Sequence, residues 1–249
     1  MEQWKGKVAI VTGASAGIGA AIAQALVHHG MVVVGLARRQ EKIQQIADYL
    51  AKSQEPGKLY ALKANLRKEE DILAAFEWVE KELGGADVLV NNAGLSIYNY
   101  IQDGKTEDWR NMWEVNVLAV TICTREYLKS MEKRNNQNGH IFIINSVGAH
   151  IHDIPAYAMY TATKYAVKGF SQCLRRELSQ KNSTIKVTSI SPSWTRTEST
   201  TSGQLEQLGS QAILEPSDVA KALIDALATT TVTQICEMII TPLPNGLIY

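Results

Sequence analysis

The sequence predicts an α/β fold, in which a single doubly wound domain carries helices on both faces of a seven-stranded parallel sheet. Short β-branched runs alternate with segments of helical period along all 249 residues. Several of these runs are apolar at every position, as in strands that are covered on both faces. A glycine-rich segment also separates the first run from the first helical segment, as is typical of doubly wound folds.

Each expected strand is a short apolar run, and each expected helix is a longer segment in which apolar residues recur at helical spacing. Strands are expected at residues 8–11, 31–36, 59–62, 88–90, 140–145, 187–190 and 235–240. Helices are expected between them at residues 17–29, 40–52, 68–83, 106–133, 158–181 and 216–227. Right-handed crossovers would then distribute the helices over both faces of the sheet.

No internal repeat and no Pro- or Gly-rich linker divides the chain, so residues 1–249 are expected to form one domain. A polar turn at residues 135–139 ends the long fourth helix. Residues 195–211 have no clear period, are rich in Thr, Ser, Gln and Gly, and exceed an ordinary connection. Because they follow the carboxyl end of a strand, we expect a flexible substrate flap there; the alternative is a plain surface loop.

Composition argues against several functional classes. Lys plus Arg equals Asp plus Glu at 25 each, and the basic residues are dispersed, so no field recruits nucleic acid or an anionic membrane. No apolar stretch approaches the ~20 residues of a membrane span, and no targeting pattern precedes the first strand, so we expect a cytoplasmic protein. Cys123, Cys173 and Cys236 are expected to be reduced and buried, and the five His have no metal-ligand spacing.

A glycine motif follows the first expected strand and opens the first expected helix, in the run Thr12-Gly13-Ala14-Ser15-Ala16-Gly17-Ile18-Gly19. Gly13 permits a tight turn, Gly17 lets the backbone approach a pyrophosphate, and Gly19 lets the helix pack against the strand. The amides at the start of the helix then face the anion. This context favours a Rossmann-type dinucleotide site over a plain β–α turn.

The end of the second expected strand distinguishes between the two nicotinamide dinucleotides. A carboxylate there accepts the ribose 2′-OH of NAD, whereas cations accommodate the 2′-phosphate of NADP. This chain has Arg38 and Arg39 at that point and no Asp or Glu. Two guanidiniums suit a dianionic phosphate, so the sequence predicts NADP(H); the alternative is a pair of solvated arginines heading the next helix.

Tyr160 and Lys164 lie four residues apart in an expected helix and therefore share a face. An ammonium beside a phenol favours the phenolate, so we expect the pKa of Tyr160 to fall from about 10 toward neutrality. A tyrosine with such a pKa transfers protons near pH 7. The spacing alone is common on solvated helices, so its meaning depends on the other motifs.

The motifs occur in a fixed order: the glycine turn, Asn91-Asn92-Ala93-Gly94, Asn116, Ser146 and the Tyr160/Lys164 pair. With this order over nearly its whole length, the chain resembles the short-chain dehydrogenase/reductase family. Residues 116–126, 139–141 and 214–220, most of which have no catalytic role, resemble a narrower branch. That branch contains the insect farnesol dehydrogenases and mammalian dehydrogenase/reductase member 11.

The resemblance implies a role for each matched residue. Tyr160 would be the general acid/base, Ser146 would hold the substrate oxygen, and Lys164 would bind the nicotinamide ribose and depress the tyrosine pKa. Asn116 would position a water of the proton relay. Simpler roles remain open: a helix-kink partner for Asn116, an N-cap for Ser146 and a surface cation for Lys164. The implied cofactor contacts are Gly13, Ser15, Gly17, Ile18, Gly19, Arg38, Arg39, Asn65, Leu66, Asn92, Ala93, Gly94, Tyr160, Lys164, Pro192, Thr195 and Thr197.

Two positions depart from the family pattern: Ser193 replaces a glycine after Pro192, and Asn65 replaces an aspartate near the adenine. An amide oxygen at Asn65 still accepts a hydrogen bond. The resemblance also implies a homodimer or homotetramer that assembles through the helices at 106–133 and 158–181, with the strand at 235–240 as a further contact.

The substrate wall is expected in the segments that follow the strands. It would comprise Ser146, Tyr160, Leu95, Ile97, Tyr98, residues 147–154, Trp194, and Leu205 and Leu208 of the flap. This set is mostly apolar, so an apolar alcohol or carbonyl fits better than a sugar phosphate or a hydroxy acid. His150 and His152 would either touch a substrate hydroxyl or be solvent-exposed or bonded to the backbone.

The sequence thus predicts an NADP(H)-dependent oxidoreductase that interconverts a hydrophobic alcohol and its aldehyde or ketone, with a farnesol-like isoprenoid alcohol favoured. A ketosteroid or carbonyl reductase is the alternative within the enzyme class. A catalytically silent NADP-sensing protein is the alternative outside it. An intact Asn116, Ser146, Tyr160 and Lys164 argues against the sensor, which needs no proton relay.

Overall fold

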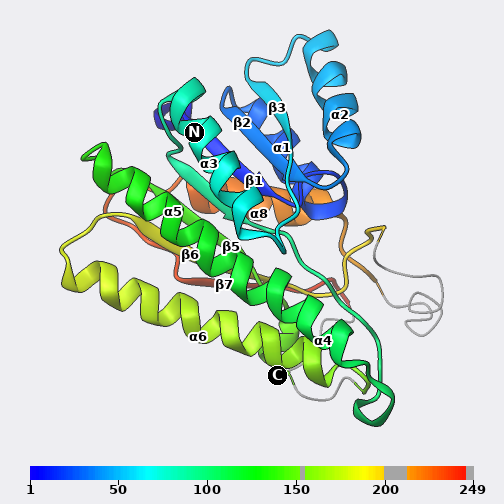
Figure 1. Cartoon of the computed structure of the whole chain (residues 1–249). Helices are drawn as coiled ribbons and strands as arrows, with labels where there is room; N and C mark the ends of the chain where they lie inside the picture. Colours follow the sequence, from blue (N-terminus) through cyan, green and yellow to red (C-terminus); the bar gives the residue numbers. More distant parts are fainter. Residues whose placement is uncertain (152–154, 199–211, 245–249) are drawn as a thin grey trace.

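The computed structural model describes residues 1–151, 155–198 and 212–244, and within them seven parallel strands form one sheet (Figure 1). Their order is β3-β2-β1-β4-β5-β6-β7. The strands are β1 Val8–Thr12, β2 Val32–Ala37, β3 Lys58–Lys63, β4 Val88–Asn91, β5 His140–Ile144, β6 Lys186–Pro192 and β7 Glu237–Ile240. The order reverses between β1 and β4, so the carboxyl ends of these two strands border the crevice where such sheets bind ligands.

Helices cover both faces of the sheet. They are α1 Gly17–His28, α2 Gln40–Lys52, α3 Glu69–Leu83, α4 Thr106–Trp113, α5 Ala119–Lys133, α6 Ala158–Gln180 and α8 Pro216–Leu227. Short 3-10 turns lie at Glu2–Trp4, Ile101–Asp103 and Val147–Ala149, and a π-helical segment, Glu114–Leu118, joins α4 to α5. One core lies between the sheet and α1, α2 and α8, and a second lies between the sheet and α3, α5 and α6. The predicted doubly wound α/β fold is confirmed.

The apolar strands are buried on both sides, as the sequence predicted. All five residues of β1 are buried. Ala9 and Val11 belong to the core beneath α1 and α8, whereas Val8 and Ile10 belong to the opposite core. Because every position of the strand meets a packed layer, no polar face is needed, and the strand reads as a continuous apolar run.

The predicted helix at 106–133 is not one regular helix. Its middle, Glu114–Leu118, is π-helical, so one extra residue is accommodated around Asn116. Apolar period alone could not show this, because the residues on both sides keep their helical spacing. The strand predicted at 235–240 begins at Glu237 and is only partly buried, because β7 lies at the edge of the sheet.

The prediction of three buried cysteines is correct for Cys123 and wrong for Cys173 and Cys236, which are exposed free thiols. Cys123 lies on the inner side of α5, in the core with α3. Cys173 lies on an outward position of α6, and Cys236 precedes the edge strand β7. An apolar residue in an edge strand or on a long helix is therefore not necessarily a core residue.

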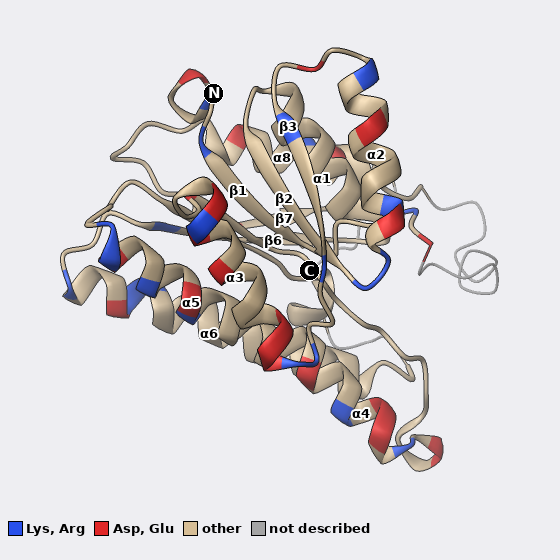
Figure 2. Ribbon diagram, turned by 45° about the horizontal axis from the view of Figure 1, so that its top comes forward, with Lys and Arg blue, Asp and Glu red and all other residues tan. Residues whose placement is uncertain are grey.

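Charged residues of both signs are intermingled on the helices, for example along α2 and α5 (Figure 2). Within the described ranges, no helix is both long enough and apolar enough to cross a membrane.

Candidate active site

The glycine motif forms the turn between β1 and α1. Gly13 and Gly17 have φ values of 69° and 55°, a left-handed backbone that strains residues with a Cβ. A Cβ on Gly19 would overlap the carbonyl of Gly13 and the side-chain amide of Asn92. The N-cap of α1 is Ala16, which has no polar side chain to cap the first amides of the helix. Those amides therefore remain available to an anion.

Thr12 and Asn92 fix this turn to the end of β4. Thr12 Oγ1 accepts hydrogen bonds from the amides of Asn92 and Ala93, at 2.9 and 3.0 Å. Asn92 Nδ2 donates to the carbonyl of Thr12 at 2.8 Å. The Nδ2 group of Asn92 thus binds the protein itself. Thr12 was not among the predicted site residues, although it opens the glycine motif.

Asn116 holds three segments together at the centre of the site. Its Oδ1 accepts from the Leu95 amide at 2.7 Å, and its Nδ2 donates to the Leu95 carbonyl at 2.8 Å and to Thr163 Oγ1 at 3.0 Å. The side chain is buried, and both of its amide hydrogens are used. Asn116 therefore positions the segment after β4 against α6, and any water of a relay would have to bind elsewhere on this residue.

Ser146, Tyr160 and Lys164 converge on one point beside Gly94 and Gly148. Ser146 Oγ accepts the Gly148 amide at 3.1 Å, so it also caps the 3-10 turn Val147–Ala149. A Cβ placed on Gly148 would lie 3.4 Å from Ser146 Oγ and 3.6 Å from the Tyr160 ring. A Cβ placed on Gly94 would lie 3.9 Å from Lys164 Nζ.

Lys164 is a buried cation, not a surface one. Its side chain is only 5% exposed, and its Nζ donates to the Ile144 carbonyl at 3.1 Å. The same Nζ lies 5.6 Å from the centre of the Tyr160 ring. Burial lowers the pKa of Lys164 to about 8, so the ammonium still predominates at pH 7.

The expected fall in the pKa of Tyr160 is contradicted. Burial raises the pKa of Tyr160 to about 12, and a hydrogen bond with the Ser146 side chain opposes this shift only in part. The physical reason is that desolvation of the phenolate outweighs the lysine, whose Nζ is directed at Ile144. Tyr160 is therefore a neutral phenol at pH 7.

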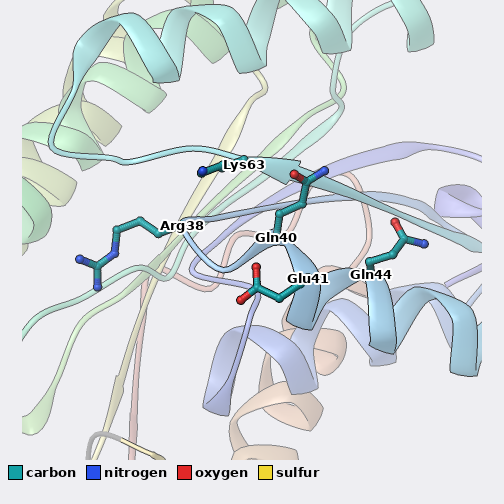
Figure 3. Close-up of a pocket in the computed structure, with 5 residues that line it drawn as sticks. All are labelled: Arg38, Gln40, Glu41, Gln44 and Lys63. Atoms are coloured by element: carbon teal, nitrogen blue, oxygen red, sulfur yellow. The ribbon is translucent and has the colours of Figure 1, made fainter.

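The two arginines at the end of β2 lie in different surroundings. Arg38 lines a surface pocket of about 380 Å³ with Lys63, Gln40, Glu41 and Gln44 (Figure 3). Arg39 instead contacts Glu198 at 2.7 Å and Ser15 Oγ at 3.3 Å. Lys63 was not among the predicted site residues. Its position at the end of β3, the strand that pairs with β2, could have indicated it.

Of the other predicted cofactor contacts, two have side chains packed in or against the cores and two have polar side chains at the surface of the site. Leu66 belongs to the core beneath α3, and Ile18 packs against the opposite core. Asn65 Oδ1 accepts the Arg67 amide at 3.3 Å and keeps a second lone pair. Thr197 lies against the glycine turn, since a Cβ on Gly17 would come within 3.0 Å of its Cγ2.

The turn after Pro192 forms without the family's glycine. Ser193 does not have a positive φ, and its amide donates to the Ile240 carbonyl at 2.8 Å. Thr195 Oγ1 donates to the Ser193 carbonyl at 2.9 Å. The segment is also held by main-chain hydrogen bonds between Trp194, Arg196 and Leu214.

An aromatic cluster borders Tyr160, and the residue at the centre of the cluster was not predicted. The buried Tyr157 ring lies 5.9 Å from Tyr160, 6.0 Å from Trp194 and 5.5 Å from Tyr98, all in edge-on geometry. Tyr98 in turn contacts the exposed Tyr100. Trp194 and Tyr98 were predicted as substrate wall, and Tyr157, three residues before Tyr160, joins them.

The His150 side chain is only 7% exposed, so this histidine does not lie in solvent. Its ring lies 3.1 Å from Ser191 Oγ and 3.0 Å from Lys168 Nζ, and burial lowers its pKa. His152, residues 153–154, most of the expected flap (199–211), and Leu205 and Leu208 lie outside the described residues.

Comparisons with known proteins agree with this geometry. Residues 7–208 match the short chain dehydrogenase family model. Farnesol dehydrogenase of Aedes aegypti is 44% identical over 97% of this chain and 98% of its own length. Human dehydrogenase/reductase SDR family member 11 is 39% identical over 97% and 96%. An alcohol dehydrogenase of the archaeon Thermococcus sibiricus, solved with 5-hydroxy-NADP, has a TM-score of 0.86 and 25% identity over 98% of this chain and all of its own.

Proposed function

Because the chain belongs to the short-chain dehydrogenase family, we propose that it is an NADP(H)-dependent oxidoreductase that interconverts a hydrophobic alcohol and its aldehyde or ketone. The grouping of Ser146, Tyr160 and Lys164 around Gly94 and Gly148 is the observation that carries the proposal. The turn suits a dinucleotide, because its glycines leave no Cβ in the groove and the first amides of α1 have no side-chain cap. When bound, the nicotinamide supplies or accepts the hydride.

The chain's own residues handle the substrate oxygen. As a neutral phenol, Tyr160 is ready to donate a proton to a carbonyl oxygen, and in the opposite direction its oxygen must take that proton back. Ser146 lies beside the Tyr160 ring and orients the same oxygen by a hydrogen bond. Lys164 brings a positive charge to the site, which favours the phenolate at the moment when Tyr160 has lost its proton.

The aromatic cluster supports an apolar substrate. Tyr157, Tyr98 and Trp194 present ring edges and faces next to Tyr160 and bring no charge to that side. A flat or branched hydrocarbon such as an isoprenoid alcohol buries its surface well against such rings. A farnesol-like alcohol is therefore our first candidate, in keeping with the name of the Aedes aegypti relative. A ketosteroid or other carbonyl compound is the second.

A substrate panel tests this function. The protein is incubated with NADP and terpenoid, retinoid and steroid alcohols, and with NADPH and the corresponding carbonyls, while absorbance at 340 nm is followed. We expect turnover with at least one isoprenoid or steroid substrate. Tight binding of NADP without any absorbance change across the panel would favour the silent sensor instead.

Arg38 is expected to select NADP over NAD. It lies beside Lys63 at the carboxyl edge of the sheet and forms no ion pair within the described residues, so its guanidinium is available to the 2′-phosphate. Arg38→Ala should weaken NADPH binding about 10- to 100-fold, as the loss of a charged hydrogen bond does, and leave NADH nearly unchanged. Fluorescence titration with both cofactors measures this, and equal losses would contradict the assignment.

We also infer a homodimer or homotetramer. Trp113 and Leu118 are exposed around the π-helical segment, and with Val117 they line an apolar hollow on the outer side of α4 and α5. Such a patch on an otherwise charged surface suits a contact between copies. A gel-filtration mass equal to one 27.4 kDa chain would contradict the inference.

A further inference from the structure

A carboxylate from the second half of the chain bridges two cations beside the dinucleotide groove. Glu198 Oε2 lies 2.7 Å from Arg39 Nη1, and Glu198 Oε1 lies 2.6 Å from Lys42 Nζ. Arg39 also donates to Ser15 Oγ in the glycine turn. The two cations belong to the end of β2 and the first turn of α2, where a 2′-phosphate is expected. Both oxygens of the carboxylate are thus engaged where a phosphate would bind.

Glu198 reaches these cations across the glycine turn. Its neighbour Thr197 packs on Gly17 in the glycine turn. Arg196, two residues before Glu198, is fixed by a main-chain bond to Leu214 and an ion pair with Glu215 at 2.8 Å. The segment that carries Glu198 is therefore held by contacts with the glycine turn and with the start of α8.

The ion pairs of Glu198 with Arg39 and Lys42 are exposed, so another anion can replace the carboxylate. Lys42 and Arg39 lower the pKa of Glu198, so its carboxylate is charged throughout the neutral range. The side chains of Glu198, Arg39 and Lys42 are 53%, 45% and 39% exposed. Exposed ion pairs of this kind contribute little stability, so a phosphate dianion that offers more charge and more acceptor oxygens is able to displace the carboxylate.

We propose that Glu198 competes with the 2′-phosphate of NADP for Arg39 and Lys42, and that Glu198 thereby limits the preference of this protein for NADP over NAD. The inference rests on the proposed function. NADP must separate Glu198 from both cations, whereas NAD has no phosphate and leaves the ion pairs intact. Arg38 forms no ion pair among the described residues, although Glu41 lines the same pocket, so NADP separates no carboxylate from Arg38.

Cofactor binding to Glu198→Gln tests the competition. NADPH and NADH are titrated by fluorescence into the wild-type protein, into Glu198→Gln, and into Glu215→Gln as control. Glu215 is an equally exposed carboxylate that pairs with Arg196 on the same segment, away from the strand end. We expect Glu198→Gln to bind NADPH about 3- to 10-fold more tightly and NADH within about twofold of wild type, since only the exposed pair is lost. Glu215→Gln should change neither affinity.

A double-mutant cycle shows whether Glu198 acts through the cations. In an Arg39→Gln, Lys42→Gln background, adding Glu198→Gln should leave NADPH affinity unchanged, because the groups for which Glu198 competes are gone. An unchanged NADPH/NADH affinity ratio in Glu198→Gln would overturn the proposal. Weaker NADPH binding would also overturn it, and would mean that Glu198 holds Arg39 in position for the phosphate. Failure of the wild-type protein to bind NADPH would instead contradict the proposed function itself, and the competition with it.

Discussion

Tyr160→Phe is expected to abolish turnover and to leave NADPH binding intact. The substitution removes only the phenolic oxygen, which is the atom that we propose exchanges a proton with the substrate. Loss of a positioned general acid/base typically costs 10²- to 10⁴-fold, and the Lys164 ammonium is bound to the Ile144 carbonyl and does not replace the phenol, so we expect kcat to fall by about 10³-fold or more. The ring, its contact with Tyr157 and the fold remain. Steady-state rates at 340 nm and a fluorescence titration with NADPH measure the two quantities separately.

Tyr165→Phe is the matched control for this variant. Tyr165 lies on the same helix, five residues further on, and its ring faces Lys168. The same atom is deleted in both variants, so a general effect of removing a hydroxyl from α6 would reduce both rates. We expect wild-type turnover for Tyr165→Phe. Residual activity of Tyr160→Phe near the wild-type level would show that another group donates the proton.

The positions of the motifs could be predicted because each is a local run at a known point of a doubly wound sheet. The glycine turn follows β1, Arg38 and Arg39 follow β2, and Ser146 follows β5, so strand order alone brings them to one edge. The side-chain roles of some motif residues were less predictable. Asn92 donates to the Thr12 carbonyl, and Asn116 binds the Leu95 main chain and the Thr163 hydroxyl; these partners depend on packing between segments far apart in the chain.

The pKa of Tyr160 shows why a spacing is insufficient. The four-residue spacing correctly placed Lys164 next to Tyr160, but a pKa is the balance of charge against desolvation. Lys164 Nζ lies 5.6 Å from the centre of the Tyr160 ring and donates to the Ile144 carbonyl, so its attraction for the phenolate is weak. Burial makes the phenolate less favourable and raises the pKa of Tyr160. Burial is a property of the folded chain, and it reversed the predicted direction.

Contacts between distant residues account for the other omissions. Glu198 is 159 positions from Arg39, and nothing in either local run indicates that they meet. The same holds for Lys63 beside Arg38 and for Tyr157 between Tyr98 and Trp194. A carboxylate is absent from the end of β2 in the sequence, yet one is supplied there by the fold. The sequence therefore showed the cations at the end of β2 but not the carboxylate that the fold brings to them.

Lys164→Met is expected to lower kcat and at the same time to change how stability depends on pH. Loss of the buried ammonium removes the charge that favours a deprotonated Tyr160, so we expect a fall of about 10²-fold or more. The folded pKa of Lys164, about 8, lies below its ordinary value of 10.5. Between these two values the unfolded chain binds more protons than the folded one, so the wild-type protein gains stability as pH rises.

The free energy of unfolding of wild type minus that of Lys164→Met isolates the contribution of Lys164 titration to stability, since the other titrating groups are common to both proteins. A difference of about 2.5 pKa units corresponds to up to about 3 kcal/mol, gained by wild type between pH 7.5 and 10.5. Urea unfolding at several pH values in this window measures it. Lys221→Met, which removes an exposed ammonium from α8, controls for net charge and should keep wild-type turnover. A difference that stays constant with pH would mean that Lys164 is hydrated in the folded protein, and its charge would then be too well screened to assist Tyr160.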